Sequence, residues 1–590
     1  MTQPLIPSKL FSDYVFEGKE TALQFWGPIP HNMKETISIS SPLISIYQEE
    51  RQPLFSKERF AELLRAISEL HQKHDLLTPT IKENLSILEE RSAIVEAAHQ
   101  PALLGGPGFV INKIAAISKL ASYQNSIPMM FVGDHDHEQK ELTVIHLPSP
   151  GPRGILFSMS IPSEYRRSPI HVLPLPPKKW LTQTLEKIRS TYHELVASSA
   201  KQKNNFYAEN IKPLLEVLET TYNQSNNLSD WTLQIWMRVI NLSKDCGVLF
   251  QSFSSPRVQQ LMFPAFEYLL NSNNRSKHLK ALNQTADQLQ QLGYQPSISY
   301  RTDDYVPFHL ECPSKGCNRT RLEPLLSTNR SHSAIIITAQ CPKCKNNHSL
   351  ETKAKTPDLS EWKGFLSPRV DTRAFLVQSY TPVIIHVGGA GETSYYAQVS
   401  PALKAIHSTV PIFYRYSRLY YSNPWTRHLA NRLTKEGFTP LKPEELQRFI
   451  SSVKAEYSEE NVGVVSSLFA ACEEYINETA TKLIQAEGIL ETKRNQIIQQ
   501  QRNTTDNIHK KDLQTRVGVI TRHRQLMQTY LSQTYGRYSA ERMGQEVSFA
   551  WIDAAVSFGI KNHFPRLLEH YQLLTPSSGT FYLFDNSLPQ

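Results

Sequence analysis

The strongest constraint on the fold of this 590-residue chain lies between residues 93 and 138. The apolar run at 93–98 has the length of a buried strand. A glycine turn follows, then apolar residues at helical spacing over 110–121, then a second apolar run at 128–133. This second run ends in five consecutive titratable residues, Asp-His-Asp-His-Glu. The order strand, glycine turn, helix, strand predicts a parallel α/β sheet.

Polar residues gather where the two strands of this unit end. In open α/β sheets ligands bind at the carboxyl ends of the strands, and a helix start favours an anion. The candidate residues are Gln100, Gly105, Gly106 and Lys113 on the turn and helix, with Asp134, His135 and Asp136 after the second strand. The glycines could serve packing alone, and the acid-histidine run could be a solvated loop. Burying so many titratable groups is costly, which favours a site with an exposed His135.

A second unit of the same kind follows far along the chain. Residues 381–387 read as a buried strand and a helix starts at about Thr393. The turn between them holds Gly388, Gly389, Gly391 and Glu392. Such a turn suits a phosphate or a carboxylate, although Glu392 could simply complement the helix dipole. Because a parallel sheet puts all strand carboxyl ends on one edge, we expect both glycine turns and the acid-histidine run to face one cleft.

Four of the six cysteines form two short motifs. Cys312 and Cys317 are separated by four residues, and Cys341 and Cys344 by two. Two such knuckles joined by a hairpin supply the tetrahedral thiolate geometry that zinc prefers. A closed four-cysteine site leaves no position for a substrate, so the sequence predicts a structural zinc. The alternative is four thiols without a metal.

A long helical pattern begins at Ile476 and extends to about Leu531. A polar break at 502–507 divides it into two amphipathic helices, which predicts an antiparallel hairpin. A lone two-helix arm would leave an apolar stripe in water, so we expect it to pair two chains. Its charges lean basic, and we favour a solvated polar face over nucleic-acid binding.

Composition narrows the class of protein. The net charge of +8 is compatible with small anionic ligands, and it is smaller than the positive charge expected of a nucleic-acid-binding protein of this length. A hydrophobic content of 40% with 20% charged residues is ordinary for a globular protein. No apolar run reaches the ~20 residues that cross a bilayer, and the first residues do not resemble a signal peptide. We therefore expect a cytoplasmic protein of two or more domains, without a membrane partner.

Two motifs carry a resemblance to a known family. The run at 99–107 with Lys113, and then Asp134-His135-Asp136, resembles the bacillithiol biosynthesis cysteine-adding enzyme BshC. Members of that family typically read Thr-Gly-Gln-Gln-Ala-Gly-Leu-Phe-Gly-Gly-Pro and Glu-Asp-His-Asp-Phe here. The run at 388–398 is similar to their Gly-Gly-Pro-Gly-Glu-Ile-Ala-Tyr-Trp-Ala-Gln. The departures are His99 for a glutamine, Gly133 for a glutamate, His137 for an aromatic residue and Ala390 for a proline.

The resemblance implies an α/β fold with a Rossmann-like parallel-sheet core, helical connecting insertions and a C-terminal coiled-coil arm that forms a homodimer. The cysteine spacing adds a four-cysteine zinc ribbon to this fold. A zinc ribbon is not general in the family, so we interpret it as an insertion. Within the connecting region, Ser229 or Asp230 is expected to cap a helix, and 246–250 to form a core strand. The expected segments are an N-terminal helical segment at 1–90, the first core half at 91–180, the connecting region at 181–300, the zinc ribbon at 301–360, the second core half at 361–450, the arm at 451–545 and a returning C-terminal segment at 546–590.

The function that the resemblance implies is a ligase, which joins the carboxyl of cysteine to the amine of glucosaminyl-malate. Amide formation needs an activated carboxyl, so ATP or ADP with magnesium is an expected cofactor. His135 could act as a general base on the amine, while Asp134 or Asp136 orients it or holds the magnesium. Arg415, at the position of a strand-end arginine of the family, would clamp an anion.

Two other functions remain open. A Rossmann-like core, a zinc ribbon and a helical arm also occur in relatives of class I aminoacyl-tRNA synthetases that bind RNA. The signatures His-Ile-Gly-His and Lys-Met-Ser-Lys-Ser are missing from this chain, which weighs against that class. The third possibility is a non-catalytic scaffold of the same fold, supported by the substitutions at His99, Gly133 and His137.

Overall fold

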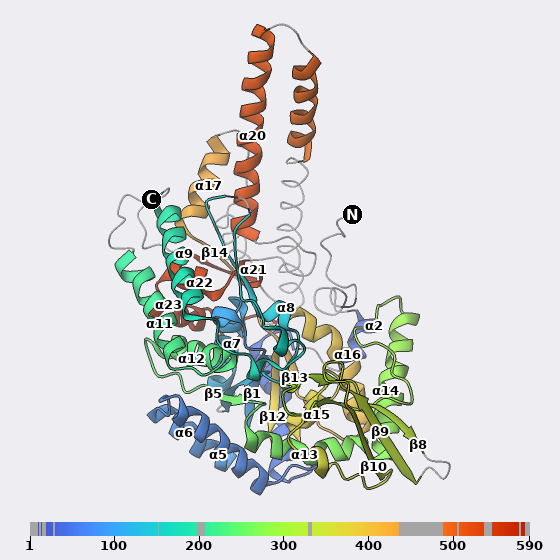
Figure 1. Cartoon of the computed structure of the whole chain (residues 1–590). Coiled ribbons are helices and arrows are strands. Elements are labelled where there is room, and N and C mark those ends of the chain that lie inside the picture. Colours follow the sequence, from blue (N-terminus) through green and yellow to red (C-terminus); the bar gives the residue numbers. More distant parts are fainter. Residues whose placement is uncertain are drawn as a thin grey trace.

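The computed structural model describes most of the chain (Figure 1). The described residues are 10, 13, 19–26, 30–91, 93–124, 126–151, 153–197, 207–328, 333–435, 488–503, 507–535, 545–577 and 580–584.

A five-stranded parallel sheet forms the centre of the fold, in the order β13-β12-β1-β2-β5. Its strands are β1 (Ile94–His99), β2 (Ile127–Val132), β5 (Leu249–Ser252), β12 (Val383–Gly388) and β13 (Ile412–Arg415). All residues of β2, β5 and β12 are buried, as expected for a parallel sheet covered on both faces. From the central pair β1 and β12, the chain proceeds outward in opposite directions. This is the doubly wound, Rossmann-like order, and the predicted fold class is confirmed.

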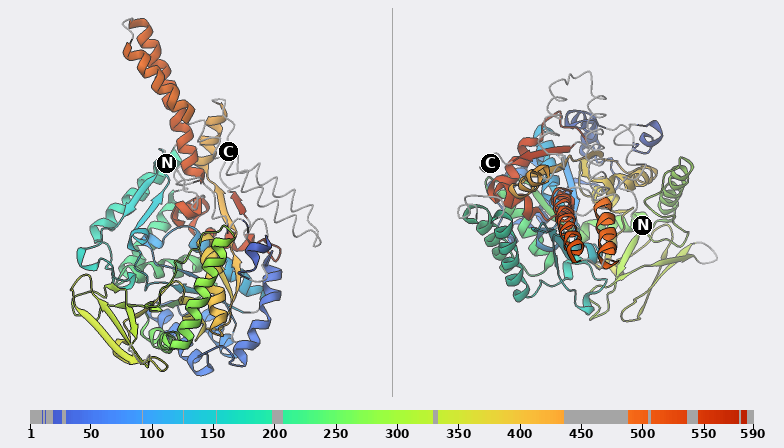
Figure 2. Two further views of the ribbon diagram at one scale, coloured as in Figure 1. Left: turned by 90° about the vertical axis from the view of Figure 1, so that its right-hand side faces the viewer. Right: turned by 90° about the horizontal axis from the view of Figure 1, so that it is seen from above.

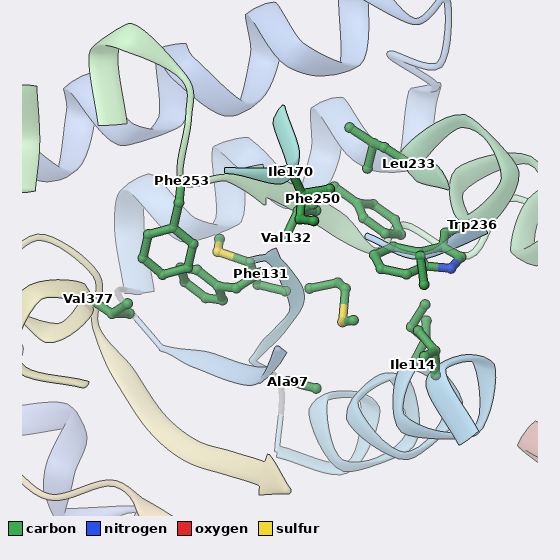
Figure 3. Close-up of a cluster of buried hydrophobic side chains, with 14 of the residues drawn as sticks. Ala97, Ile114, Phe131, Val132, Ile170, Leu233, Trp236, Phe250, Phe253 and Val377 are labelled. Atoms are coloured by element: carbon green, nitrogen blue, oxygen red, sulfur yellow. The ribbon is translucent and has the colours of Figure 1, made fainter. Parts of the chain in front are cut away.

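The helices next to the sheet follow from the apolar patterns. Helix α7 (Phe109–Gln124) connects β1 to β2 and contacts both, and α16 (Ala390–Ala405) connects β12 to β13. Figure 3 shows side chains of β1, β2 and β5 packed with Ile114 of α7 and with Leu233 and Trp236 of α12 (Leu228–Asn241). These apolar contacts fix the ends of β1, β2 and β12, and therefore the loops that follow them.

The remaining elements surround this core. The other helices of the body are α2 (Glu20–Leu23), α3 (Met33–Ser40), α4 (Pro42–Gln48), α5 (Lys57–Lys73), α6 (Pro79–Arg91), α8 (Gln139–Leu142), α9 (Lys178–Ala197), α11 (Lys212–Asn223), α13 (Pro256–Leu270), α14 (Ser272–Gln291), α15 (Arg373–Gln378), α17 (Pro424–Lys435), α21 (Gln545–Ser548), α22 (Trp551–Phe558) and α23 (Ile560–His570). Single turns are η1 (Leu103–Gly105), η2 (Ser163–Tyr165), η3 (Ile170–Val172), η4 (Tyr207–Ile211) and η5 (Ser360–Trp362). Two two-stranded sheets pair β3 (Val144–Leu147) with β4 (Ile155–Ser158), and β14 (Arg418–Ser422) with β15 (Thr580–Phe584).

Two details of the connecting region differ from the sequence predictions. Asn227 caps α12, because its side-chain oxygen accepts from the backbone N–H of Asp230 at 2.8 Å. Ser229 and Asp230 already lie inside the helix, so the predicted caps are wrong. Strand β5 begins only at Leu249, because Gly247 adopts a left-handed turn with φ of 65° before it.

The cysteine-containing insertion consists of two small antiparallel sheets. One has the order β11-β6-β7, with β6 (Phe308–Glu311), β7 (Arg321–Leu322) and β11 (Leu366–Pro368). The other has the order β10-β9-β8, with β8 (Leu325–Thr328), β9 (Ala334–Gln340) and β10 (Asn347–Lys353). The first cysteine knuckle follows β6, and the second lies in the turn between β9 and β10.

Near the C-terminus a helical hairpin projects from the body (Figure 2). A helix at 488–503 runs antiparallel to α20 (Asn507–Tyr535). Arg494 Nε donates to Thr521 Oγ1 at 3.2 Å, and Arg524 forms an ion pair with Glu491. The predicted hairpin is present in this part, while its expected beginning at 476–487 lies outside the described residues. None of the described helices is both long and apolar enough to span a membrane.

Candidate active site

A cavity of about 960 Å³ lies where the carboxyl ends of β1, β2 and β12 meet. Residues from both halves of the core line it, including His99 at the end of β1 and Gln100 after it, His135 and Asp136 after β2, and Gly389 after β12. β1 and β12 are the neighbours at which the strand order reverses, which is the usual ligand position in this fold. The acid-histidine run and the second glycine turn therefore share one cleft.

The first glycine turn packs against the protein interior. Gly105 has a φ of 85°, and a Cβ atom there would lie 2.5 Å from Nε1 of Trp551. Its carbonyl accepts from Trp236 Nε1 at 2.7 Å. Neither Gly105 nor Gly106 lines the cavity, so close packing and a left-handed backbone account for these glycines. On this side Gln100, Ala102 and Pro107 line the cavity instead.

Asp134 is a structural carboxylate. Its oxygens accept from Ser252 Oγ at 2.6 Å, from Ser254 N at 2.9 Å and from the hydroxyls of Ser254 and Ser229. The side chain is buried and does not line the cavity. These donors come from the last residue of β5, from the loop after it and from α12, so Asp134 ties β2 to its neighbours.

His135 and Asp136 both line the cavity. Asp136 accepts from Gln100 Nε2 at 2.8 Å and from the backbone N–H groups of His137 and Glu138. The His135 ring lies 4.7 Å from the Phe253 ring, and only 8% of the residue is exposed. The expected exposed histidine is thus wrong, because Phe253 covers it. Burial lowers the pKa of His135 far below its usual value, so the imidazole is neutral at neutral pH.

The glycines of the second turn have two roles: one packs in the interior and two line the cavity. A Cβ on Gly388 would lie 2.5 Å from the Phe413 ring, and Gly388 does not line the cavity. Gly389 and Gly391 do line it, and a Cβ atom on Gly391 would have no neighbouring atom within 4 Å. Glu392, in the first turn of α16, accepts from the backbone N–H of Gly389 at 2.7 Å.

Glu392 belongs to a buried chain of alternating charges. Lys113 Nζ lies 2.6 Å from Glu392 Oε2 and also donates to the Ala98 carbonyl. On the other side His386 Nε2 lies 3.8 Å from Glu392 Oε1, and His386 Nδ1 lies 2.7 Å from Glu96 Oε1. Burial would raise the pKa of Glu392, but the attraction of Lys113 and the contact with His386 outweigh it and hold the pKa well below its usual value. Lys113 therefore reaches the cavity as half of an ion pair.

Arginines line the cavity, although the predicted one does not. Arg415 ends β13 and is buried, with its backbone N–H donating to Ser577 Oγ at 3.3 Å. The arginines that do line the cavity are Arg301, Arg321, Arg369, Arg373 and Arg418. They come from the cysteine insertion, from the turn before α15, from the first residue of α15 and from β14. The only local signal for them is the four-residue spacing of Arg369 and Arg373, which is typical of one helical turn.

The four cysteines form one cluster, separate from the cavity lining. Their ligand atoms all lie within 4.8 Å of one another. The Sγ atoms of Cys312 and Cys344 are 3.8 Å apart, and those of Cys317 and Cys341 are 3.9 Å apart. A tetrahedral metal with bonds of about 2.3 Å to sulfur would place the sulfurs about 3.8 Å apart. The cysteines thus match the geometry of a four-thiolate metal site. His348 lies at the edge of this site, with its Nε2 atom 3.5 Å from Cys312 Sγ.

Residues 6–416 match the family model described as bacillithiol biosynthesis BshC, N-terminal Rossmann-like domain. The chain belongs to the BshC family. The resemblance seen in the two glycine motifs is therefore confirmed, and the matched region includes the whole parallel sheet and nearly all of the cavity.

Several curated members of the BshC family are similar to this chain. Proteins called "Putative cysteine ligase BshC" from Geobacillus sp. (strain WCH70), Bacillus velezensis and Desulforamulus reducens are 23%, 21% and 22% identical to it. The alignments cover 59%, 69% and 65% of this chain. They cover 59%, 68% and 65% of the relatives, so the chain spans about three fifths to two thirds of the BshC proteins that it matches.

Proposed function

We propose that this chain is a cysteine ligase that joins the carboxyl of cysteine to the amine of glucosaminyl-malate. The observation that carries the proposal is the single cavity in which the two family motifs meet, with His135 and Asp136 from one and Gly389 and Glu392 from the other. Membership of the BshC family, whose curated relatives are named as cysteine ligases, favours this function over the RNA-binding and scaffold alternatives.

The chemistry needs an activated cysteine carboxyl, and transfer of a phosphoryl group from magnesium-bound ATP to a carboxylate oxygen, with release of ADP, would supply it. The amine of glucosaminyl-malate would then attack the acyl carbon, so that the new C–N bond forms, the C–O bond to phosphate breaks and inorganic phosphate leaves. The neutral imidazole of His135 can take the proton that leaves the nitrogen. Asp136, held by Gln100, would stabilise the imidazolium, while Gly389, Gly391 and the start of α16 suit a phosphate.

The replacement His135→Phe tests this assignment. A phenyl ring preserves the packing on Phe253 and removes both ring nitrogens, so stability should change little. We expect amide formation from cysteine, glucosaminyl-malate and ATP to fall by at least about 100-fold, as for loss of a general base. His193→Ala, at an exposed position of α9, is the control and should retain activity. Full activity of His135→Phe would refute the role of His135, and a wild-type chain that forms no amide would refute the ligase.

We also propose that the four cysteines hold zinc, because tetrahedral thiolate sites with short spacings favour that metal. The projecting hairpin is proposed as a dimerisation arm. Its residues Ile489 and Val519 are 58% and 39% exposed, and pairing with a second chain would cover them. Light scattering at micromolar concentration should report two chains per particle. A monomer there, or a dimer that survives replacement of 488–535 by a short linker, would contradict the proposal.

A further inference from the structure

Part of the cavity wall is cationic and comes from the cysteine insertion and the turn that follows it. Arg321 forms the start of β7, directly after the first cysteine knuckle. Arg369 and Arg373 follow β11, and all three residues line the cavity. Lysines and arginines outnumber aspartates and glutamates in the cavity lining by seven to three. The cavity is therefore suited to an anionic ligand beyond what the glycine turns would hold.

The small sheet β11-β6-β7 presents Arg321 to the cavity. Side chains alternate between the two faces of a strand, and directly paired residues share a face. Leu310, Leu322 and Leu366 are paired across the three strands and are all buried, so they form the inner face. Arg321 and His309 lie on the opposite face, and both line the cavity.

The cysteine knuckle fixes the beginning of β7. The backbone N–H of Cys312 donates to the carbonyl of Thr320 at 2.9 Å, which closes the loop immediately before Arg321. Asn318, inside that loop, donates from Nδ2 to the carbonyl of Glu164 in the core at 2.9 Å. The position of Arg321 over the cavity is thus held by the loop that follows the cysteine knuckle, and by its own backbone N–H, which donates to the Arg167 carbonyl at 2.9 Å.

The three arginines have more donors than their present partners use. One carboxylate, that of Glu323, is shared between Arg321 Nε at 3.3 Å, Arg369 Nη2 at 3.0 Å and His309 Nδ1 at 3.2 Å. Arg369 Nε also donates to the Phe308 carbonyl at 3.2 Å. Arg373 donates from Nη2 to the Tyr395 hydroxyl at 2.8 Å, and no carboxylate of the described residues lies within ion-pair distance of it. An arginine carries five N–H donors, so each can bind a further anion.

The spacing of the arginines favours a ligand with two anionic groups. The backbone N–H of Arg373 donates to the carbonyl of Arg369 at 2.9 Å, so these two residues are one helical turn apart. In a helical turn the Cβ atoms of two residues at this spacing lie about 5–6 Å apart on the same face. Two neighbouring planar guanidinium groups match two neighbouring carboxylates, each bound through paired N–H donors.

We propose that Arg321, Arg369 and Arg373 bind the two carboxylates of the malate part of the acceptor substrate. The four-cysteine insertion then carries one wall of the substrate site, in addition to any role in stability. This inference rests on the proposed function, since that function supplies the malate group. It assigns acceptor recognition to residues that neither family motif contains.

The test measures binding of free L-malate by calorimetry to the full chain and to Arg321→Gln, Arg369→Gln and Arg373→Gln. Loss of one charge-assisted pair should weaken malate binding by about 10- to 100-fold in each variant. Lys353→Gln removes one positive charge from the exposed face of β10 in the same insertion and should leave the affinity unchanged. Lactate, with one carboxylate, and inorganic phosphate should both bind the wild-type chain more weakly than malate.

Steady-state kinetics separate this inference from the proposed function. The arginine variants should raise KM for glucosaminyl-malate while KM for cysteine stays unchanged. Unaltered malate affinity in all three variants would overturn the inference, even for an active ligase. So would wild-type binding of lactate or phosphate as tight as that of malate. A third outcome is that the wild-type chain binds malate specifically and the variants lose this binding, but the chain forms no amide. That outcome would support the dicarboxylate site and refute the ligase function.

Discussion

The ion pair between Lys113 and Glu392 should couple the two halves of the core, and Lys113→Met tests it. Lys113 is 3% exposed and the Glu392 side chain 16%, so water screens the pair little. At the separation of 2.6 Å and an effective dielectric constant of about 20, the gross attraction is about 6 kcal/mol. Folding of the variant no longer requires the desolvation of an ammonium group, and this gain offsets part of the lost attraction.

The expected net loss in the free energy of unfolding is about 3 kcal/mol, the lower end of the range for breaking a buried pair. The lower end applies because Glu392 keeps the Gly389 N–H and the nearby His386. Urea unfolding should show that Lys113→Met/Glu392→Gln loses less than the sum of the two single variants, with a coupling above about 1 kcal/mol. Lys119→Met, on the same helix, has no carboxylate of the described residues within ion-pair distance and should cost little.

The pH dependence gives a second check on the same pair. In the wild-type chain the pKa of Glu392 is lower in the folded state than in the unfolded state. The ionised carboxylate therefore stabilises the fold at pH values above the usual glutamate pKa, and this stabilisation is lost as the pH falls through the lowered pKa. Without Lys113, burial raises the pKa of Glu392 in the folded state, so stability falls as the pH rises through that raised value. The difference between wild type and Lys113→Met should therefore be smaller at pH 5 than at pH 8. The coupling would be refuted if the two single variants lost free energy of unfolding additively. It would also be refuted if the difference in stability between wild type and Lys113→Met did not depend on pH.

Three further predictions follow from the site. Elemental analysis should find one zinc per chain, and Cys341→Ser/Cys344→Ser should lose the metal and lower the Tm, because structural zinc contributes its binding energy to folding. Asp134→Asn should lower the free energy of unfolding by about 1–3 kcal/mol, seen in urea, because buried serine donors lose a charged acceptor. Gly105→Ala should unfold at much lower urea concentration, since its Cβ would clash with Trp551, whereas Gly391→Ala has open space and should reduce only ligand binding.

The fold was largely predictable because its signals are local. Strands β1, β2 and β12 and helix α7 each follow an apolar pattern that burial demands within a dozen residues. The meeting of the acid-histidine run with the second glycine turn in one cleft also followed, since parallel strands share an edge for their carboxyl ends. The same prediction was wrong for Gly105 and Gly106 of the first turn, which do not line the cavity. The cap at Asn227 was missed because several neighbouring side chains there can cap equally well, and only the backbone decides which one lies before the helix.

Roles within the candidate site depend on contacts that no local pattern contains. Asp134 and Asp136 lie in the same short acid-histidine run, yet serines at the end of β5 and in the loop after it hold Asp134 in the interior, while Gln100 holds Asp136 at the cavity. The sequence predicted Gly105 as a ligand-binding glycine. In the structure Trp551, which lies far along the chain, occupies the space beside it.

The cationic wall shows the same limit most clearly. The cysteine spacing predicts a closed metal site, and a closed site suggests a structural role alone. What the spacing does not contain is the direction in which the insertion faces. The pairing of β6 with β7 and β11 buries one row of leucines, and alternation then turns Arg321 towards the cavity. Under the proposed roles, a metal held by the four cysteines would shape the substrate site without binding substrate, because it would hold the loop from which Arg321 extends.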